Sequence, residues 1–582
     1  MKNSLNRIWG WPLALFVIVV AAYGPFLGTR FIRTAGDEKV YISQALEMAR
    51  DGRWFVQTLM DVPDYYKGPL HFLLLRLGFL IFGLSSWAAL YMNLLLVFAG
   101  ALAVGKLVER HLPPGDPVSP VRSETGLPLS AASFFALSIG IYAHMFASQM
   151  EVELASFFAV GLYLLDRLKP EQAGFGFWIL AGVIGWIKAP LHSVFLGVTA
   201  LLFWLLTGQL LQKVKNWKAW VAALSGVAVC VAGFAPALVL DYSNFVSTYI
   251  SKEILGKVAT NQSRWVSINS AFGFYLLPWL FMVLVSYFQF VARLPRLVRD
   301  ARTQRMLALG FCGFVPSVLF FLWHPYRFEN YNLPVISGII LCVVTLFHFR
   351  TAVWDHLYRL GFLLTAVIVA SVPVLLTILA GRFSPLPAWW PGWLVPFVWI
   401  TSLVSVGGIL WFGVFGKTLR LQWLAPSALG VFWAIGAFCA VLGEREMVDL
   451  RALIAETKAH GARPELVYYN LHVNMFSEWG LLSCSVGTPI PGIHAPDRLR
   501  QAMMSGKTVL VPAGEGTDHF RAFIKREFPP EKGNVFVIRP WKRWKTHGAE
   551  NNVPLWRVAW DRRDLSILER DYLIVRRVSG PS

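Results

Sequence analysis

Long apolar runs recur along the first three quarters of the sequence, and they limit the chain to one class of fold. A helix that crosses a bilayer needs about 20 mostly apolar residues, and only helices and closed barrels satisfy their backbone hydrogen bonds inside hydrocarbon. The mean hydropathy of +0.52 and a hydrophobic share of 56% exclude a single soluble globule of this length. We therefore predict a polytopic α-helical membrane protein with thirteen spans, at residues 9–28, 87–108, 128–148, 152–166, 174–187, 190–207, 218–240, 271–292, 306–323, 332–349, 358–380, 393–415 and 424–442.

The sequence changes character near residue 443. From there to residue 582, 21 Lys and Arg stand against 16 Asp and Glu, and mixed segments replace the long apolar runs. The chain is expected to divide into a membrane domain, 1–442, and a soluble α/β domain, 443–582. This second domain shows strand-like and helical patterns in turn, the strands at 465–470, 508–513, 534–540 and 572–578 and the helices at 446–460, 496–505 and 518–528.

Positive charge is distributed unevenly between the loops, and this sets the predicted orientation. If the apolar run at 68–84, which carries Arg76, does not span, the loops on one side hold 19 Lys and Arg and the short loops on the other side hold six. Because Lys and Arg in short loops stay in the cytoplasm, we expect a cytoplasmic N-terminus and an extracytoplasmic C-terminal domain. The run 68–84 is then an interfacial or re-entrant helix within a long first outer loop, 29–86. The net charge of +19 follows from this topology, so nucleic acid is not an expected partner.

With this orientation, the unusual polar residues gather on the outer face. Ionisable groups at span ends line a cavity or meet lipid headgroups. Anionic lipid attracts basic residues and repels acids, so the acids of this face favour a polar cavity. The first outer loop supplies Asp37, Glu38 and Lys67, and later outer turns supply Glu151, Glu153, Lys188, His192, His324, Arg327, Asn330 and Tyr331.

The segment after Asp37 has the pattern of an amphipathic helix that lies flat on the membrane. Ile42, Ala45, Leu46 and Ala49 recur at helical spacing on one face. An acid just ahead of a helix can cap its N-terminus and meet its dipole. Capping is therefore the alternative to a catalytic role for Asp37.

The order of these motifs resembles that of the GT-C superfamily of membrane glycosyltransferases, with the bacterial lipid A aminoarabinose transferases and the protein O-mannosyltransferases as the most similar group. These proteins have an Asp-Glu pair after the first span, an amphipathic helix, an aromatic-acid-Lys-Pro-Pro-Leu stretch, a second acid after span three, a Lys-Gly-Pro between later spans and a Tyr-x-Leu-Pro. The resemblance covers residues 1 to about 350. Its matches here are Asp37 with Glu38, the helix 40–50, YYKGPLHF (65–72), Glu151, IKAPLHS (187–193) and ENYNLP (329–334).

The resemblance implies a multi-pass glycosyltransferase of the bacterial inner membrane, with a periplasmic C-terminal domain. It would move a sugar from a polyprenyl-phosphate donor to lipid A, another envelope glycan or a protein on the periplasmic face. Asp37 is expected to be the general base, with Glu38 and Glu151 as further catalytic carboxylates. If the acceptor is a phosphate, no base is needed, and Asp37 would orient the nucleophile or stabilise oxocarbenium-like charge.

The same resemblance implies roles for the remaining polar residues of the outer face. A lipid phosphate leaves the sugar and gains charge in the transition state, which suits basic partners. Lys67, Arg327 and Lys188 are therefore expected to bind the donor phosphate. Substrate contacts are expected from Tyr66, His71, Asn330, Tyr331 and Glu153, in a site that also meets membrane lipids.

Some features depart from the family pattern and leave alternatives open. Tyr66 stands where relatives often have an acid, which removes one candidate metal ligand, and Ala189 replaces the usual Gly. The pair Glu151 and Glu153 could hold a divalent cation or could bond a nearby helix end, and no cofactor is certain. His192 and His324 lack spaced partners, which argues against zinc.

Two other functions remain as alternatives at the level of the sequence. A transporter or flippase of a lipid-linked solute would be expected to have polar or broken spans and internal repeats, whereas these spans are clean. A ligase that joins whole polysaccharides would differ only in the size of its donor and acceptor.

Overall fold

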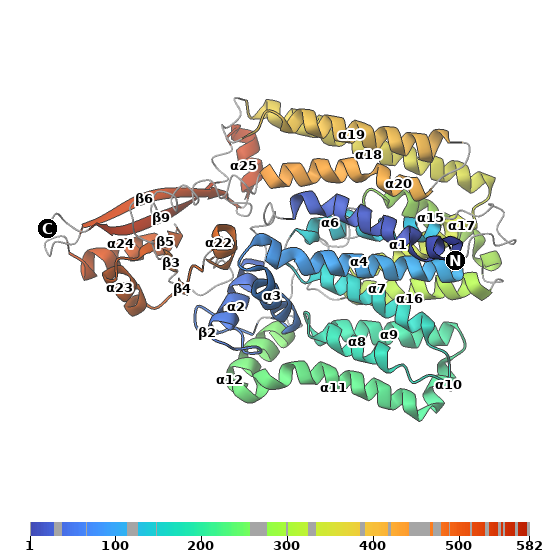
Figure 1. Cartoon of the computed structure of the whole chain (residues 1–582), viewed down its shortest axis with the longest axis horizontal. Helices are drawn as coiled ribbons and strands as arrows, with labels where there is room; N and C mark the ends of the chain where they lie inside the picture. Colours follow the sequence, from blue (N-terminus) through green and yellow to red (C-terminus); the bar gives the residue numbers. More distant parts are fainter. Residues whose placement is uncertain are drawn as a thin grey trace.

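A computed structural model of the chain describes most of the membrane domain and parts of the C-terminal domain. Figure 1 shows a bundle of helices with a β-sheet beyond one end, which we call the sheet end. The described residues are 2–27, 38–65, 67–112, 126–146, 148–256, 276–297, 301–323, 333–384, 390–416, 421–441, 466–469, 479–487, 489–512, 515–529, 535–544, 549–550, 553–564 and 569–578.

The bundle consists of apolar helices of unequal length. Local signals set several of their ends: Ser85 Oγ accepts a hydrogen bond from Ala88 N at 3.0 Å at the start of α4, and Pro190 opens α9. Small residues let helices approach closely, since a Cβ on Gly182 of α8 would overlap the Gly226 carbonyl of α11. The principal helices are α1 (Lys2–Tyr23), α4 (Ser86–His111), α5 (Leu127–Ala136), α6 (Ile139–Met145), α7 (Glu151–Arg167), α8 (Phe175–Gly185), α9 (Pro190–Leu206), α11 (Trp217–Leu240), α15 (Leu280–Leu297), α16 (Ala301–Trp323), α17 (Val335–His348), α18 (Ala352–Arg382), α19 (Leu394–Leu410) and α20 (Leu421–Ser427).

The lengths of these helices bear on the predicted number of spans. Within the described residues, five helices are long and apolar enough to cross a membrane, and a sixth span results if α5 and α6, bent by 51°, count as one. Seven shorter apolar helices accompany them. The chain is thus a helical membrane protein, and the count of thirteen spans stays a prediction.

The two ends of the bundle carry different elements. In Figure 1 the N-terminus and α10 (Leu210–Lys215) lie at the end away from the sheet, whereas α2 (Glu38–Arg50), α3 (Leu70–Phe82) and α12 (Tyr242–Phe245) lie at the sheet end. Helix α2 is the amphipathic helix predicted at 40–50. Helix α3 falls within the run 68–84 and lies beside α2, and its interfacial or re-entrant placement stays a prediction.

The described C-terminal residues form a five-stranded mixed sheet in the order β4-β3-β5-β9-β6. Strand β3 pairs in parallel with β4 and β5, and β9 pairs antiparallel with β5 and β6. The four predicted strands correspond to β3, β5, β6 and β9, and the predicted helices at 496–505 and 518–528 correspond to α23 and α24. The helix predicted at 446–460 and the boundary at 442/443 lie outside the described residues. The elements are β3 (Leu466–Tyr469), β4 (Gly492–Ile493), β5 (Thr508–Pro512), β6 (Val535–Trp544), β9 (Glu569–Val578), α22 (Trp479–Val486), α23 (Pro496–Met504), α24 (Glu515–Glu527) and α25 (Leu555–Arg562).

Candidate functional site

Buried polar residues from three segments are linked by direct contacts at the start of α3, the start of α7 and the turn between α8 and α9. The segments are the loop before α3 and the first turn of α3, the first turn of α7, and the turn that joins α8 to α9. Buried ionisable groups are costly unless they are paired, so their partners define the site. The site residues described here are Lys67, His71, Glu151, Glu153, Lys188 and His192, all of them buried.

Glu151 and Lys188 form a buried ion pair across two helices. Glu151 is the first residue of α7, where an acid is favoured by the helix dipole, and Lys188 lies in the turn before α9. The Lys188 Nζ donates to Glu151 Oε1 at 2.5 Å. The second family acid and the lysine of the IKAPLHS motif are therefore direct partners.

Glu153 and His71 form a second buried pair beside the first. His71 Nδ1 lies 2.7 Å from Glu153 Oε1. The carboxylate accepts a hydrogen bond from Nδ1–H, which fixes the orientation of the ring. Tyr41 of α2 packs edge-on against the His71 ring, with centroids 5.3 Å apart. His71 Nε2 and Glu153 Oε2 have no hydrogen-bond partner among the residues that the structure covers.

The Lys67-Gly68-Pro69 segment packs directly against the turn that carries Lys188. Leu70 N donates to Trp186 O at 2.9 Å, and a Cβ on Gly68 would overlap that same carbonyl, so only glycine fits. Gln57 Nε2 donates to Lys67 O at 3.0 Å and holds the segment from the other side. The YYKGPLHF motif is thus in contact with Trp186, the residue directly before the IKAPLHS motif about 120 residues away in the sequence.

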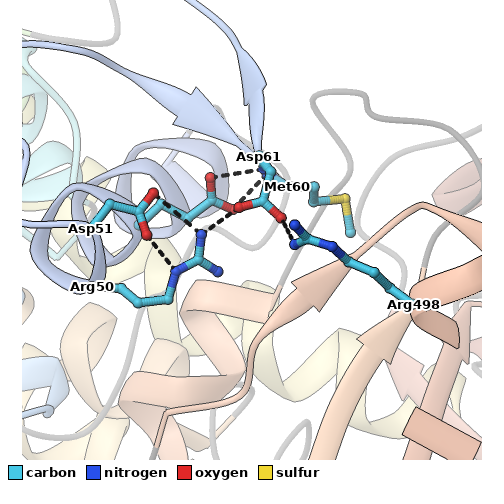
Figure 2. A network of polar contacts seen from close by, with 6 residues as sticks. Arg50, Asp51, Met60, Asp61 and Arg498 are labelled. Atoms are coloured by element: carbon cyan, nitrogen blue, oxygen red, sulfur yellow. Dashed lines mark hydrogen bonds and ion pairs between the residues drawn. The ribbon is translucent and has the colours of Figure 1, made fainter. Parts of the chain in front are cut away.

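Helix α2 is fixed by a polar network that reaches helix α23 in the C-terminal part of the chain. Met60 and Asp61 adopt left-handed backbone conformations, with φ of 56° and 66°, and their N–H groups donate to the Glu47 carboxylate at 2.5 and 3.2 Å. Burial raises the pKa of Glu47, while these hydrogen bonds oppose the rise. Figure 2 shows Asp61 between two arginines, Arg50 of α2 and Arg498 of α23.

A second contact joins α2 to the C-terminal residues. Gly480 N, in α22, donates to Ser43 Oγ at 3.0 Å, and a Cβ on Gly480 would lie 2.5 Å from Ser43 N. The sequence predicted neither this contact nor the ion pair of Asp61 with Arg498, because Ser43 and Asp61 each lie 437 residues from their partner. Pairing at such separation depends on domain docking and leaves no local sequence signal.

A third contact missed by sequence reasoning closes the first loop against α11. The Tyr65 hydroxyl donates to Asp241 Oδ2 at 3.0 Å, and burial raises the pKa of that hydroxyl above its usual range. An acid directly after an apolar run, as at Asp241, was the available signal. The contact places the residue before Tyr66 at the end of α11.

The acid-x-acid pair of α7 does not converge on one point. Glu151 bonds Lys188 and Glu153 bonds His71, so each carboxylate already has a different basic partner. Among the described residues, no group of three His, Cys, Asp or Glu side chains is placed to hold a metal ion. Both ring nitrogens of His192 lack a hydrogen-bond partner within the same residues. A divalent cation stays a prediction.

Several predicted site residues lie outside the described residues. For Glu38 only the backbone, as the first residue of α2, is described. The others are Asp37, Tyr66, Arg327, Asn330 and Tyr331. Their predicted roles are neither confirmed nor contradicted by the geometry.

Comparisons with known proteins decide the fold. No protein-family model matches the sequence, and no curated protein sequence matches it either. The solved structures that match over almost the whole chain include ArnT from Cupriavidus metallidurans bound to undecaprenyl phosphate, with a TM-score of 0.62, and the same protein in the apo state, with a TM-score of 0.61. The chain has the ArnT fold.

The match to ArnT is one of structure and not of sequence. The identities are 15% and 16%, while the superposition covers 98% of this chain and 99% of each ArnT chain. ArnT is a lipid A aminoarabinose transferase of the GT-C class, so the resemblance predicted from the motifs is confirmed at the level of the fold. Because the coverage is nearly complete, the ArnT fold includes both the bundle and the C-terminal sheet.

Proposed function

We propose that the protein is a glycosyltransferase that moves a sugar from a polyprenyl-phosphate donor to an acceptor on the periplasmic face of the inner membrane. The observation that carries the proposal is the ArnT fold, which extends over 98% of the chain and in one crystal structure holds undecaprenyl phosphate. The buried pair of Glu151 and Lys188, packed beside the Lys67 segment, supports it. Lipid A, another envelope glycan and a protein are the candidate acceptors.

In the proposed reaction, an acceptor oxygen attacks the anomeric carbon and the bond from that carbon to the phosphate oxygen breaks. Asp37 takes the proton of an acceptor hydroxyl, with Glu38 next to it in sequence. Lys67 and Arg327 stabilise the phosphate that leaves with its lipid. If the acceptor is itself a phosphate, Asp37 orients it and no proton is removed.

Glu151 and Lys188 act as a unit in this proposal. The carboxylate holds the Lys188 ammonium at 2.5 Å in a buried position. The fixed ammonium then presents positive charge to the donor phosphate without reorganising during the reaction. Glu153 and His71, fixed in the same way, contact the acceptor or the sugar.

The proposal is tested with Asp37→Asn in a transfer assay that supplies a polyprenyl-phosphate sugar and a membrane glycolipid. Transfer to a hydroxyl should fall by about 100-fold or more, the usual contribution of a general base. The control is Glu171→Gln, which removes an exposed carboxylate from the loop before α8. Full activity of the Asp37 variant would remove Asp37 from the mechanism, and absence of transfer by the wild-type chain from every donor tried would remove the proposed function.

A further inference from the structure

Arg76 of α3 is a buried cation that no carboxylate balances within the described part of the chain. Its side chain stacks on the Trp54 ring, with the guanidinium carbon 3.6 Å from the ring centroid. Its Nη1 donates to Arg53 O at 2.5 Å, and its Nε, also buried, has no hydrogen-bond partner among these residues. Only 7% of the residue is exposed.

Three other buried Lys and Arg side chains of the described residues are satisfied by the protein. Lys188 pairs with Glu151, and Arg350 Nε lies 2.9 Å from Asp355 Oδ1. Lys213, at the far end of the bundle, donates to two carbonyl oxygens at 2.6 and 2.7 Å. A guanidinium presents five N–H donors in a planar fork, and one carbonyl uses only a small part of them. Among the residues that the structure describes, no anion therefore meets the need that the burial of Arg76 creates.

The surface next to Arg76 indicates what kind of molecule brings that anion. On the same helix, Leu77, Leu80, Ile81 and Phe82 are all exposed, Leu80 by 63%. Trp54, which covers the guanidinium, is 46% exposed, as expected of a tryptophan at a membrane interface. Helix α3 lies at the sheet end of the bundle, beside α2 (Figure 1). An anion that fits both the buried Arg76 guanidinium and the exposed apolar side chains beside it carries a hydrocarbon chain.

We propose that Arg76 and Trp54 form a binding site for the phosphate group of a membrane lipid, whose acyl chain lies along Leu77, Leu80 and Ile81. Phosphate oxygens match the planar fork of arginine and accept charge-assisted hydrogen bonds from it. Trp54 keeps the fork in one orientation by stacking. The site is separate from the Glu151 and Lys188 pair, and it binds its lipid whether or not a sugar is transferred.

The test measures lipid binding to the full-length protein by native mass spectrometry, without any sugar donor. The probes are phosphatidic acid, diacylglycerol with the same acyl chains, and inorganic phosphate as a competitor. Wild-type protein should retain phosphatidic acid in preference to diacylglycerol. Arg76→Gln should lower phosphatidic acid binding by at least about tenfold, because it removes charge-assisted hydrogen bonds.

Two further variants keep the result interpretable. Lys213→Gln removes another buried, Trp-stacked cation at the far end of the bundle and should bind phosphatidic acid like the wild type. Trp54→Ala leaves the charge in place and removes the stacking ring, so it should weaken binding less than Arg76→Gln does. If Arg76→Gln does not fold, the binding of phosphatidic acid by Trp54→Ala tests the proposal in its place.

Three outcomes would overturn the proposal. Equal binding of phosphatidic acid by wild type and by a folded Arg76→Gln or Trp54→Ala variant would leave Arg76 without a role in lipid binding. Equal binding of diacylglycerol and phosphatidic acid by the wild type would exclude recognition of phosphate. Displacement of phosphatidic acid by an equal concentration of inorganic phosphate would exclude a lipid site. None of these results bears on sugar transfer, so this proposal and the proposed function stand or fall separately.

Discussion

Two glutamates two positions apart on α7 each hold a base that another segment supplies. Residues two positions apart on a helix do not share a face. Glu151 and Glu153 therefore reach different neighbours, Lys188 and His71. The pairing converts two buried acids, which would be costly alone, into two fixed acid–base pairs. At the residue scale, the first turn of α7 thus organises both the α8–α9 turn and the start of α3.

The Glu151 and Lys188 pair can be separated into its structural and its chemical contributions. Lys188→Met leaves Glu151 buried without its base and should lower the free energy of unfolding by about 3–5 kcal/mol, as is usual when one partner of a buried pair is removed. The double variant Glu151→Gln with Lys188→Met should recover much of that loss, yet stay inactive in sugar transfer. Thermal unfolding and the transfer assay measure the two effects. Recovery of activity in the double variant would show that the pair serves stability alone.

Helix α2 connects the membrane domain to the C-terminal sheet at the element scale. Its Tyr41 packs against His71, its Ser43 accepts from Gly480, and its Arg50 shares Asp61 with Arg498. The ion pairs are partly exposed, so each adds little to stability. The buried contact at Gly480 is the tighter constraint, because no side chain fits there.

This constraint predicts the effect of Gly480→Ala. The added methyl would lie 2.5 Å from Ser43 N, and overpacking of this kind typically costs about 1–3 kcal/mol. Amide hydrogens of α2 should therefore exchange faster, as measured by hydrogen–deuterium exchange of residues 38–50. Gly176→Ala in α8, where a Cβ meets nothing within 4 Å, is the matched control. Unchanged exchange in the Gly480 variant would mean that α22 does not hold α2.

For the whole molecule, the sequence predicted the fold better than it predicted the contacts between distant residues. Motif order along the outer loops led to a resemblance to the GT-C class, and the ArnT fold of the chain agrees with it at the level of the fold. Helix α2 and strands β3, β5, β6 and β9 were all expected. The count of thirteen spans stays a prediction, because several helices packed inside the bundle are too short to be recognised as spans by length: α5 has 10 residues and α6 has seven. Local patterns carry no information on which distant elements dock.

Side-chain partners escaped prediction for the same reason. The sequence singled out Glu151, Glu153, Lys188 and His71 as polar residues on one face. It did not predict that Glu151 bonds Lys188 and that Glu153 bonds His71. Those pairings depend on how α3, α7 and the α8–α9 turn pack. The close approach of Gly68 to Trp186, the residue directly before the IKAPLHS motif, is likewise a property of tertiary packing.

The orientation of the molecule in the membrane follows from charge and can be tested directly. The loop at 168–174 lies at the end of the bundle away from the sheet, and the excess of Lys and Arg predicts that this end faces the cytoplasm. In intact cells whose outer membrane has been made permeable, a maleimide that cannot cross the inner membrane should label Ser243→Cys and Ser505→Cys but not Glu171→Cys. All three positions are exposed, so labelling depends on sidedness rather than burial. After disruption of the inner membrane, position 171 should react as fast as the other two. Labelling of 171 and protection of 243 and 505 in intact cells would reverse the topology and place the Glu151 and Lys188 pair on the cytoplasmic side, where a periplasmic transfer reaction is excluded.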